Sequence, residues 1–453
     1  MAAFENFSQS SVFIAICVGK PLPNREYHPM ELKTPLIKLF SDERVVSPDD
    51  ARIRELIPAN WKNLPQFVVF PENANELSAL VELANEANVS LLPYGGGTQL
   101  QTGYPPSSEY PYLMVSLSKM NQILDYQPED MTITCEPGTT LQEIQTRLAT
   151  RRQFLALDVP LPERATMGGI VSTNLSGFWR PTFGTPRDLL IGVRAVTAKG
   201  EQVRGGGKVV KNVAGYDICK LFTGAWGTLG ILTELTFRVR PLPDTMTILT
   251  WRMENLSSAC ALGLQLHHAQ LAPVSIFATN EIENQPTLVT ELQGTSERVS
   301  WQAEEFKRRV LESGVAIEAV EISLEKRSAL LSLQSRGSEG SAVSLKISCL
   351  PSDCAKVVDS LERIPGIQMT AICGTGSMSL ALPSFDSDTL ETVKRSVPKD
   401  ANLIWTKVDV SQSGSLEPDI WGAKRGEFLL HQSLKKALDP DNRFSPGRFY
   451  GKL

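Results

Sequence analysis

The sequence has few of the residues that build metal centres and redox-active thiol pairs. It contains only 4 histidines in 453 residues, and none of them forms an HxH or HExxH pattern. Its 7 cysteines are scattered without a CxxC pair, which argues against iron–sulfur and structural zinc sites. An odd, dispersed set of cysteines is typical of reduced thiols in the cytoplasm. We therefore expect no metal site and a cytoplasmic protein.

Long apolar runs and an excess of basic charge are also missing. The apolar run at residues 12–18 is far shorter than a membrane span of about 20 residues, and no basic segment precedes it as in a signal peptide. A net charge of −5 gives no electrostatic signature of nucleic-acid binding. With 42% hydrophobic and 21% charged residues, the chain has the composition of a globular protein. Its length predicts two or three domains.

Two nucleotide-binding fingerprints fail. A GxGxxG motif beginning at Gly95 would need glycine at the position of Leu100. A P-loop ending at Lys208 would need Ser or Thr next, where Val209 stands. The sequence therefore favours neither a Rossmann dinucleotide site nor a P-loop.

One glycine-rich stretch, residues 164–188, is the most informative part of the chain. It reads RATMGGIVSTNLSGFWRPTFGTPRD, so glycines stand among small polar residues. Glycine lets backbone approach a ligand closely, and Ser, Thr and Asn add short hydrogen-bonding groups. The run is too poor in large apolar side chains to predict a core element. It indicates backbone wrapped around a flat, polar-edged ligand; the alternative is a glycine-rich cluster of turns between strands.

A second glycine loop follows a predicted β-α-β unit. Residues 67–70 predict a buried strand, 77–87 an amphipathic helix and 89–92 another strand. The chain then enters the loop 93–98, PYGGGT, whose backbone N–H groups can form an anion-binding nest. Further along, Thr140 and Glu143 predict a capping box for another helix.

Beyond Pro241 and Pro243 glycine becomes rarer and the pattern changes. Residues 247–322 predict a β-α-β-β-α-β order, and a similar order recurs from 342 to 410. This favours two split β-α-β units that form one antiparallel sheet. A final helix is expected from Asp419, whereas the prolines of residues 1–60 are expected to prevent any long element there.

These pieces together resemble flavoenzymes of the vanillyl-alcohol oxidase type, which have a PCMH-type FAD-binding domain. Within that superfamily the likeness is to the FAD-binding E subunit of bacterial glycolate oxidase. It rests on PENANELSALVELANEANVSLLPYGGGT, EPGTTLQEIQ, ATMGGIVSTNLSG with RPTFGTPRD, KNVAGYDICKLFTGAWGTLGILTE and LDPDNRFSPGRFY. These stretches span residues 67–241 and 430–450, a little under half of the chain.

The resemblance implies an α+β fold in which a PCMH-type FAD-binding domain of two α+β subdomains carries an inserted antiparallel-sheet cap. The expected segments are an unassigned extension (1–60), the FAD-binding domain (61–241), the cap or substrate domain (242–410) and a C-terminal segment that returns to the FAD-binding domain (411–453). The cofactor implied is FAD, held non-covalently, because the glycine loop lacks the histidine often used for covalent attachment. The resemblance implies cofactor contacts at Gly95, Gly96, Gly97, Thr98, Thr166, Gly168, Gly169, Thr173, Asn174, Gly184, Gly230, Ile231 and Glu234. We expect a bulky side chain at Gly96 or Gly169 to empty the site without unfolding the protein.

The sequence departs from the family in the residues that take part in proton transfer. The sibling D subunit and D-lactate dehydrogenases carry a His-rich metal-binding motif that orients a 2-hydroxy acid and accepts its proton. Here the corresponding late strand, residues 404–409, has no histidine. Lys407, Asp409 and His431 remain as bases only by elimination, so the catalytic residues are left unassigned.

The resemblance implies the FAD-binding subunit of a complex that oxidises glycolate to glyoxylate. Its partners would be a D-type flavin subunit and an iron–sulfur subunit. The implied location is cytoplasmic, with membrane association through those subunits left open. Two alternatives remain: a self-sufficient FAD-dependent 2-hydroxy-acid dehydrogenase, and a non-catalytic assembly subunit with a vestigial flavin site.

Overall fold

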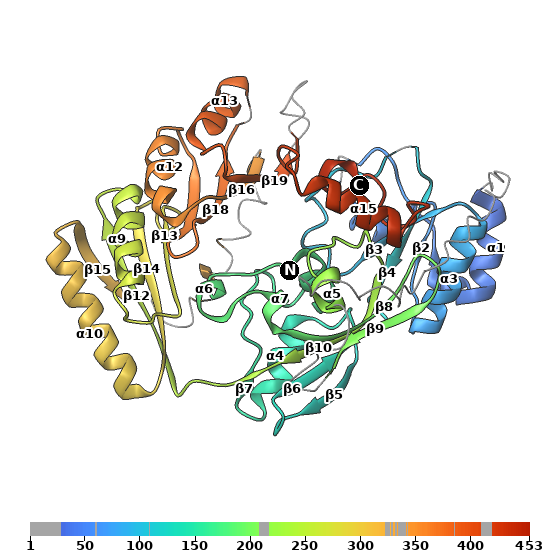
Figure 1. Cartoon of the computed structure of the whole chain (residues 1–453), viewed down its shortest axis with the longest axis horizontal. Helices are drawn as coiled ribbons and strands as arrows, with labels where there is room; N and C mark the ends of the chain where they lie inside the picture. The colour runs from blue at the N-terminus through green and yellow to red at the C-terminus, as the bar shows by residue number, and fades with distance from the viewer. Residues whose placement is uncertain are drawn as a thin grey trace, which may run out of the picture.

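The structure is a computed structural model. It describes residues 29–58, 61–107, 109–207, 217–321, 327, 329–330, 333, 341, 343–384, 386–408 and 419–453. Figure 1 shows two large parts joined side by side, one built from the first half of the chain and the other from residues after 241.

The first half begins with a small sheet of order β1-β2-β4-β3. Strands β2, β4 and β3 run parallel, while β1 pairs antiparallel with β2. The elements of this layer are α1 (Pro29–Phe40), η1 (Asp42–Arg44), β1 (Val45–Val46), α2 (Ala51–Arg54), β2 (Val68–Val69), α3 (Ala74–Glu86), β3 (Ser90–Tyr94) and β4 (Tyr112–Ser116). The predicted β-α-β unit is therefore present and leads directly into the glycine loop.

The N-terminal region is more ordered than its prolines predict. Helix α1 continues through Pro35, and its Leu32, Leu36 and Phe40 are buried against the core that α3 and the first sheet form. The expectation that prolines prevent a long element there is wrong, because tertiary packing stabilises the helix. Residues 1–28 lie outside the described part of the chain.

A second, antiparallel sheet has the order β5-β6-β10-β8-β9. The Thr140–Glu143 capping box is confirmed at the start of α4, with both reciprocal hydrogen bonds present. The elements here are β5 (Ile123–Gln127), β6 (Thr132–Cys135), α4 (Leu141–Ala149), β7 (Gln153–Phe154), α5 (Met167–Thr173), α6 (Arg180–Phe183), α7 (Pro186–Leu189), β8 (Leu190–Val196), β9 (Gln202–Gly206), α8 (Ile218–Phe222), β10 (Ile231–Arg238) and β11 (Arg240–Pro241), which pairs with β7.

The glycine-rich stretch 164–188 is partly a core element, contrary to expectation. It folds into α5, α6 and α7, and Met167, Ile170 and Val171 of α5 are at most 1% exposed. Three large side chains on one face are enough to anchor so short a helix in the core. The opposite, glycine-bearing face of α5 is left for the cavity described below.

Residues after 241 form one eight-stranded antiparallel sheet of order β15-β12-β14-β13-β17-β18-β16-β19. Each half of this order contains one β-α-β-β-α-β unit with the same internal strand order, and the halves meet at β13 and β17. The predicted tandem repeat and antiparallel cap are thus confirmed. The elements are β12 (Thr245–Met253), α9 (Leu256–His268), β13 (Ser275–Thr279), β14 (Thr287–Gly294), α10 (Ser296–Ser313), β15 (Ala316–Glu321), β16 (Val343–Ser348), η3 (Pro351–Asp353), α12 (Cys354–Leu361), β17 (Gln368–Ile372), β18 (Ser377–Leu382), α13 (Ser387–Ser396) and β19 (Asn402–Val408).

The helices α9, α10, α12 and α13 lie over one face of the cap sheet (Figure 1). Every second residue of β16 and β18 is apolar and points to that face. Examples are Leu345 and Ile347 of β16 and Leu380 of β18, which are buried in the cap core. Because side chains alternate along a strand, the intervening residues of the same strands point to the other face.

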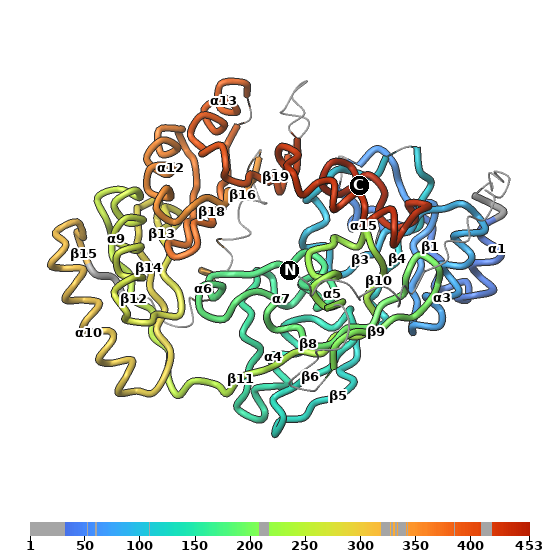
Figure 2. Tube along the Cα trace, in the orientation of Figure 1, coloured from blue at the N-terminus to red at the C-terminus, as the bar shows by residue number. Residues whose placement is uncertain are grey.

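The chain returns to the first half at its C-terminus, as its red colour beside the blue first layer shows in Figure 2. Leu91 of β3 and Phe444 form a parallel bridge, and Phe444 is fully buried in the core of the first sheet. Helix α15 (Phe428–Leu438) begins later than the predicted Asp419, and η4 (Tyr450–Lys452) follows it. The domain bounds at 60, 241 and 410 themselves stay a prediction.

A buried lysine holds this C-terminal segment in place. The Lys435 ammonium donates hydrogen bonds to Asp439 Oδ2 (2.6 Å), to the Phe444 carbonyl (2.8 Å) and to the Thr228 carbonyl (2.9 Å). Lys435 and Asp439 side chains are 8% and 0% exposed. The lysine therefore joins the tail to the loop before β10.

We expect Lys435→Met to lower the free energy of unfolding by about 3–5 kcal/mol, because it leaves the buried Asp439 carboxylate without its cation. The matched control is Lys436→Met, which removes an exposed lysine from the same helix. Urea denaturation of both variants tests this. Equal stability of the two variants would show that the lysine network does not hold the tail.

Candidate active site

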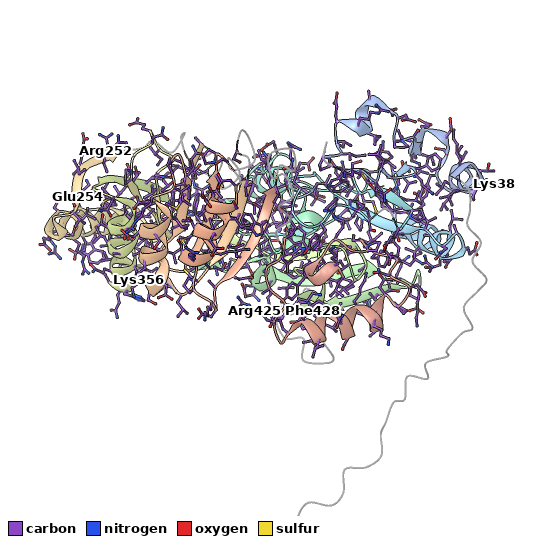
Figure 3. The ribbon with its side chains drawn as sticks, turned by 90° about the horizontal axis from the view of Figure 1, so that it is seen from above. Lys38, Arg252, Glu254, Lys356, Arg425 and Phe428 are labelled. Atoms are coloured by element: carbon purple, nitrogen blue, oxygen red, sulfur yellow. The ribbon has the colours of Figure 1, made fainter. Side chains whose placement is uncertain are left out.

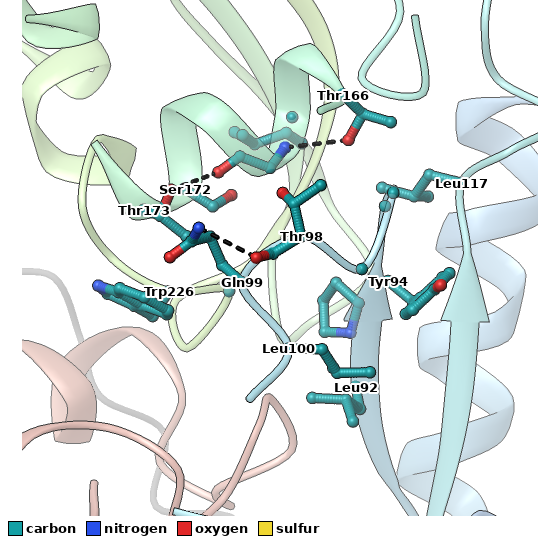
Figure 4. Close-up of a pocket in the computed structure, with 18 of the residues that line it drawn as sticks. Leu92, Tyr94, Thr98, Gln99, Leu100, Leu117, Thr166, Ser172, Thr173 and Trp226 are labelled. Carbon is teal, nitrogen blue, oxygen red and sulfur yellow. Dashed lines mark hydrogen bonds between the residues drawn. The ribbon is translucent and has the colours of Figure 1, made fainter. Parts of the chain in front are cut away.

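A cavity lies between the two glycine-rich loops and the end of the chain; we call it the glycine-loop cavity. Its empty space amounts to about 920 Å³, and part of that space is open solvent. Its walls are Leu92, Pro93, Tyr94, Gly95, Gly96, Gly97, Thr98, Gln99, Leu100, Thr102, Leu117, Thr166, Gly168, Gly169, Ser172, Thr173, Trp226, Gly227, Gly230, Ile231, Leu232 and Arg448. Figure 4 shows Thr98 on the loop side and Thr166, Ser172 and Thr173 on the α5 side.

The loop 95–97 lies directly against the segment that starts α5. A Cβ atom at Gly96 would lie 1.6 Å from the carbonyl oxygen of Arg164, and one at Gly95 would lie 2.3 Å from Thr166 Oγ1. Any side chain at Gly96 would therefore push two backbone segments apart. Here glycine is required by loop-to-loop contact, so the expectation that a bulky side chain at Gly96 would empty the site without disturbing the fold needs correction.

Gly169 is different, because the space beside it belongs to the cavity. A Cβ atom there would meet only Thr166 Oγ1, at 3.2 Å. The Gly169 N–H donates to that same hydroxyl (3.3 Å), and its carbonyl accepts from Thr173 Oγ1 (2.8 Å), as the dashed lines of Figure 4 show. The two threonine hydroxyls thus fix the cavity-facing turn of α5.

Donor groups line this cavity without partners inside the protein. Within the described residues, the backbone N–H groups of Gly96, Gly97 and Thr98 donate no hydrogen bond. Arg448 Nη2 donates to the Leu100 and Thr102 carbonyls, whereas its buried Nη1 has no hydrogen-bond partner among those residues. Burial lowers the pKa of Arg448 to about 10. Unused donors around a cavity fit a ligand rich in acceptor oxygens, as the phosphates and ribityl chain of FAD are.

Three of the predicted cofactor residues lie outside the cavity wall. Asn174 ends α5 in the left-handed conformation, and its Oδ1 accepts from the Arg187 N–H. Gly184 ends α6 beside Asp188, and Glu234 forms an ion pair with Arg194 at 3.2 Å. The other ten predicted residues line the cavity together, and their contact with FAD stays a prediction. Of the KNVAGYD motif, residues 211–216 lie outside the described part of the chain.

A second cavity, the interdomain cavity, lies between the first half and the cap sheet. It adjoins the first, because Gly97, Thr98, Gln99 and Thr102 line both cavities. Thr102 Oγ1 also donates to the Thr406 carbonyl of β19 (3.2 Å). The other residues that line the interdomain cavity are Gln101, Pro160, Leu161, Arg164, Leu175, Glu281, Leu333, Ser344, Leu345, Lys346, Ser379, Leu380, Ala381, Thr406 and Lys407.

A row of polar side chains crosses the cap-sheet face opposite the helices; we call it the polar row. Its members, Lys346, Ser379, Thr370 and Thr279, stand opposite one another on the neighbouring strands β16, β18, β17 and β13. Thr370 Oγ1 lies 2.8 Å from Thr279 Oγ1 and donates to Glu281 Oε1 at 2.8 Å. The row therefore ends in a cation on one side and a carboxylate on the other.

Sequence reasoning missed the polar row, although a signal was present. In β16 the order Val-Ser-Leu-Lys-Ile-Ser alternates apolar and polar residues, which predicts one buried face and one polar face. Only the sheet order brings Lys346 beside Ser379, and that order was not readable from the chain. Trp226 and Arg448, which line the glycine-loop cavity, were also missed as individual residues.

Of the bases named by elimination, one reaches the interdomain cavity. Lys407 lines it, with Nζ donating to the Ser341 carbonyl at 3.0 Å. His431 stacks edge-on with Phe449 and Tyr450 and lines neither cavity. Asp409 lies outside the described residues.

Across the described ranges, no group of three or more His, Cys, Asp and Glu side chains is placed to hold a metal ion. None of the helices in that part of the chain combines the length and apolarity needed to cross a bilayer.

The fold and the cavity define a class of protein. The family model described as "FAD binding domain" matches residues 65–206, which contain both glycine loops. The overall fold is shared with p-cresol methylhydroxylase (TM-score 0.70, 16% identity, 92% of this chain and 96% of that one). It is also shared with alkyldihydroxyacetonephosphate synthase (TM-score 0.71, 18% identity, 94% and 86%). The protein is a flavoprotein with a PCMH-type FAD-binding domain and an antiparallel cap.

Sequence relatives narrow the class to a family. The chain is 30% identical to glycolate oxidase subunit GlcE of Escherichia coli over 381 residues, 83% of this chain and 97% of that protein. It is 26% identical over 470 residues to glycolate oxidase subunit GlcD of Bacillus subtilis, 93% and 97% of the two chains. A D-lactate dehydrogenase of Archaeoglobus fulgidus is 35% identical over 182 residues, 40% of each chain. The chain belongs to the family of FAD-linked oxidases that includes the glycolate oxidase subunits, and it is an FAD-dependent oxidoreductase.

Proposed function

We propose that this chain is the FAD-binding subunit of a complex that oxidises glycolate, a small 2-hydroxy acid, to glyoxylate. The observation that carries the proposal is that the two cavities adjoin. Gly97, Thr98, Gln99 and Thr102 form one wall of the glycine-loop cavity and one wall of a polar cavity under the cap. A substrate in the second cavity would thus lie next to a flavin in the first.

The charges of the interdomain cavity favour an organic acid. Arg164, Lys346 and Lys407 line it, with Glu281 as the acidic member of the wall among the residues described. An excess of cationic side chains stabilises a bound carboxylate. The relatives point the same way, since they are named as glycolate oxidase subunits, D-lactate dehydrogenases and D-2-hydroxyglutarate dehydrogenases.

In this proposal the glycine-loop cavity holds FAD non-covalently. The free N–H groups of Gly96, Gly97 and Thr98 and the unpaired Nη1 of Arg448 would bind its pyrophosphate or sugar oxygens. Neither histidine nor cysteine occurs among the lining residues the structure describes, which favours non-covalent binding. The flavin supplies the two-electron acceptor, and the protein positions the substrate under the cap and excludes water.

Partners follow from the subunit names of the relatives. We propose a D-type flavin subunit and an iron–sulfur subunit as partners, because GlcD and GlcE relatives are both described as subunits of glycolate oxidase. The family's His-rich motif is absent from β19, so the proton acceptor for efficient glycolate oxidation is expected to depend on the assembled complex.

The test is glycolate turnover with an artificial electron acceptor, measured for the FAD-loaded chain alone and with its partner subunits. We expect turnover by the isolated chain to fall below the ordinary enzyme range of about 1–10³ per second and to enter that range on assembly. Full turnover by the isolated chain would support a self-sufficient dehydrogenase instead. Absence of bound flavin from the chain would support an assembly subunit with a vestigial site.

A further inference from the structure

Lys346 is a lysine in an unusual position. It lies in the middle of β16, between β18 and β19 of an eight-stranded sheet, and its side chain lines the interdomain cavity. Among the described residues, no carboxylate forms an ion pair with it and no acceptor takes a hydrogen bond from its ammonium. A lysine that faces a cavity from an interior strand, with no partner among the described residues, is rare in folded proteins.

The described residues around Lys346 do not compensate its charge. Burial lowers the pKa of Lys346, and the positive charge of Arg180 lowers it further. The carboxylate of Glu281 is bonded to Thr370 of β17, two strands from β16, and two strand spacings amount to about 10 Å. In the part of the chain that the structure describes, the position beside Lys346 thus lacks a negative charge.

We infer that Lys346 binds the carboxylate of the substrate and is the residue that selects an anionic 2-hydroxy acid over an uncharged alcohol. The inference rests on the proposed function, because it places the substrate in the interdomain cavity. Lys346 is then a binding residue, with Ser379 beside it on β18 as a further hydrogen-bond donor to the acid. Once the carboxylate binds, it supplies the counter-charge that Lys346 does not receive from the described residues.

A purely structural role for Lys346 predicts that Lys346→Met lowers the stability of the free chain, whereas the binding role predicts that it does not. Lysine without a partner inside a sheet destabilises the fold, and a methionine of similar length would fill the same volume without charge. The free chain should therefore be as stable with Lys346→Met as without it, or more stable. Loss of ligand binding without loss of stability is the signature of the binding role.

The experiment measures binding of oxalate, a two-carbon acid that has no hydrogen to transfer, by isothermal titration calorimetry of the full chain. We expect Lys346→Met to raise the Kd by at least about 30-fold, since losing one partner of a buried charge pair is that costly. Lys346→Arg should recover a large part of the affinity. The matched control is Lys356→Met, which removes an exposed lysine from α12 of the cap (Figure 3).

Further outcomes separate this inference from the proposed function. Oxalate binding that is equal in wild type and Lys346→Met, or undetectable in wild type, would overturn the role of Lys346. Where the chain or its complex reduces flavin, wild type should prefer glycolate to the uncharged glycolamide, and Lys346→Met should lose that preference. Oxalate binding that depends on Lys346 without any flavin reduction by glycolate would contradict the proposed function and leave the anion site standing.

Discussion

Gly169→Val is expected to remove FAD from the protein while the fold persists. The valine side chain would enter the glycine-loop cavity, since the space beside Gly169 contains only Thr166 Oγ1 within 4 Å. Valine is also a better helix former than glycine, so α5 should not unfold. Forcing extra atoms into a filled site typically costs about 1–3 kcal/mol, and we expect FAD affinity to fall more than about tenfold.

Flavin content after purification and the thermal stability of the FAD-free proteins measure the two halves of this expectation. Gly426→Val is the matched control, because no atom of the described structure lies within 4 Å of a Cβ atom at that exposed position. Gly96→Val should behave differently from both: it clashes with the Arg164 carbonyl and should lower flavin content and stability together. Full flavin content in Gly169→Val would contradict the placement of FAD in this cavity.

Arg327→Met is expected to weaken the junction between the two halves of the chain. Arg327 lies between two buried carboxylates, 3.3 Å from Glu291 Oε1 and 3.6 Å from Asp158 Oδ2, and its guanidinium stacks over Trp179 at 4.3 Å. Trp179 Nε1 donates to Glu291 (2.6 Å), and the backbone N–H of Trp179 donates to Asp158. Removing the arginine leaves the Glu291 carboxylate buried without its cation, which typically costs about 3–5 kcal/mol.

Chemical denaturation, with Arg363→Met as the control, tests this junction. Arg363 is 79% exposed on the same cap, and such surface changes are usually within about 0.5 kcal/mol of neutral. If Arg327→Met were no less stable than Arg363→Met, the buried cluster would not join the two halves.

The same cluster predicts a pH dependence of stability. Burial raises the pKa of Asp158 from its ordinary 3.8 to about 8, with Arg327 opposing and Glu291 adding to the shift. Between those two pKa values, Asp158 keeps its proton in the folded protein and loses it in the unfolded chain. The free energy of unfolding therefore falls as the pH rises from about 4 to about 8. Asp158→Asn should remove this slope from urea midpoints measured between pH 5 and pH 8.

Local patterns in the sequence were sufficient for most of the fold. The capping box at Thr140, the helix over α3 and the alternation of the cap strands each depend on neighbours within a few residues. The tandem order of the cap units followed from the same signals. Pattern reasoning failed where tertiary packing overrides local preference, as in α1 with its internal Pro35 and in α5 with its buried face.

The candidate site was predictable only in part, for a related reason. Glycine loops can be recognised in a sequence because close backbone approach requires glycine, and ten of the predicted residues do line one cavity. Glu234 and Asn174 instead form local interactions that no spacing in the sequence reveals. Lys346 and Glu281 are 65 positions apart. Only the order of β13, β17, β18 and β16 places Lys346 on the same polar row as Thr370, to which Glu281 is hydrogen-bonded.

The absorbance spectrum of the purified chain tests the central claim most directly. If the chain binds FAD non-covalently, we expect the visible bands of bound flavin and release of free FAD into solution on denaturation. We also expect those bands to bleach when glycolate is added anaerobically to the assembled complex. A colourless protein that takes up no FAD would contradict the claim, as would flavin that stays attached to the denatured chain.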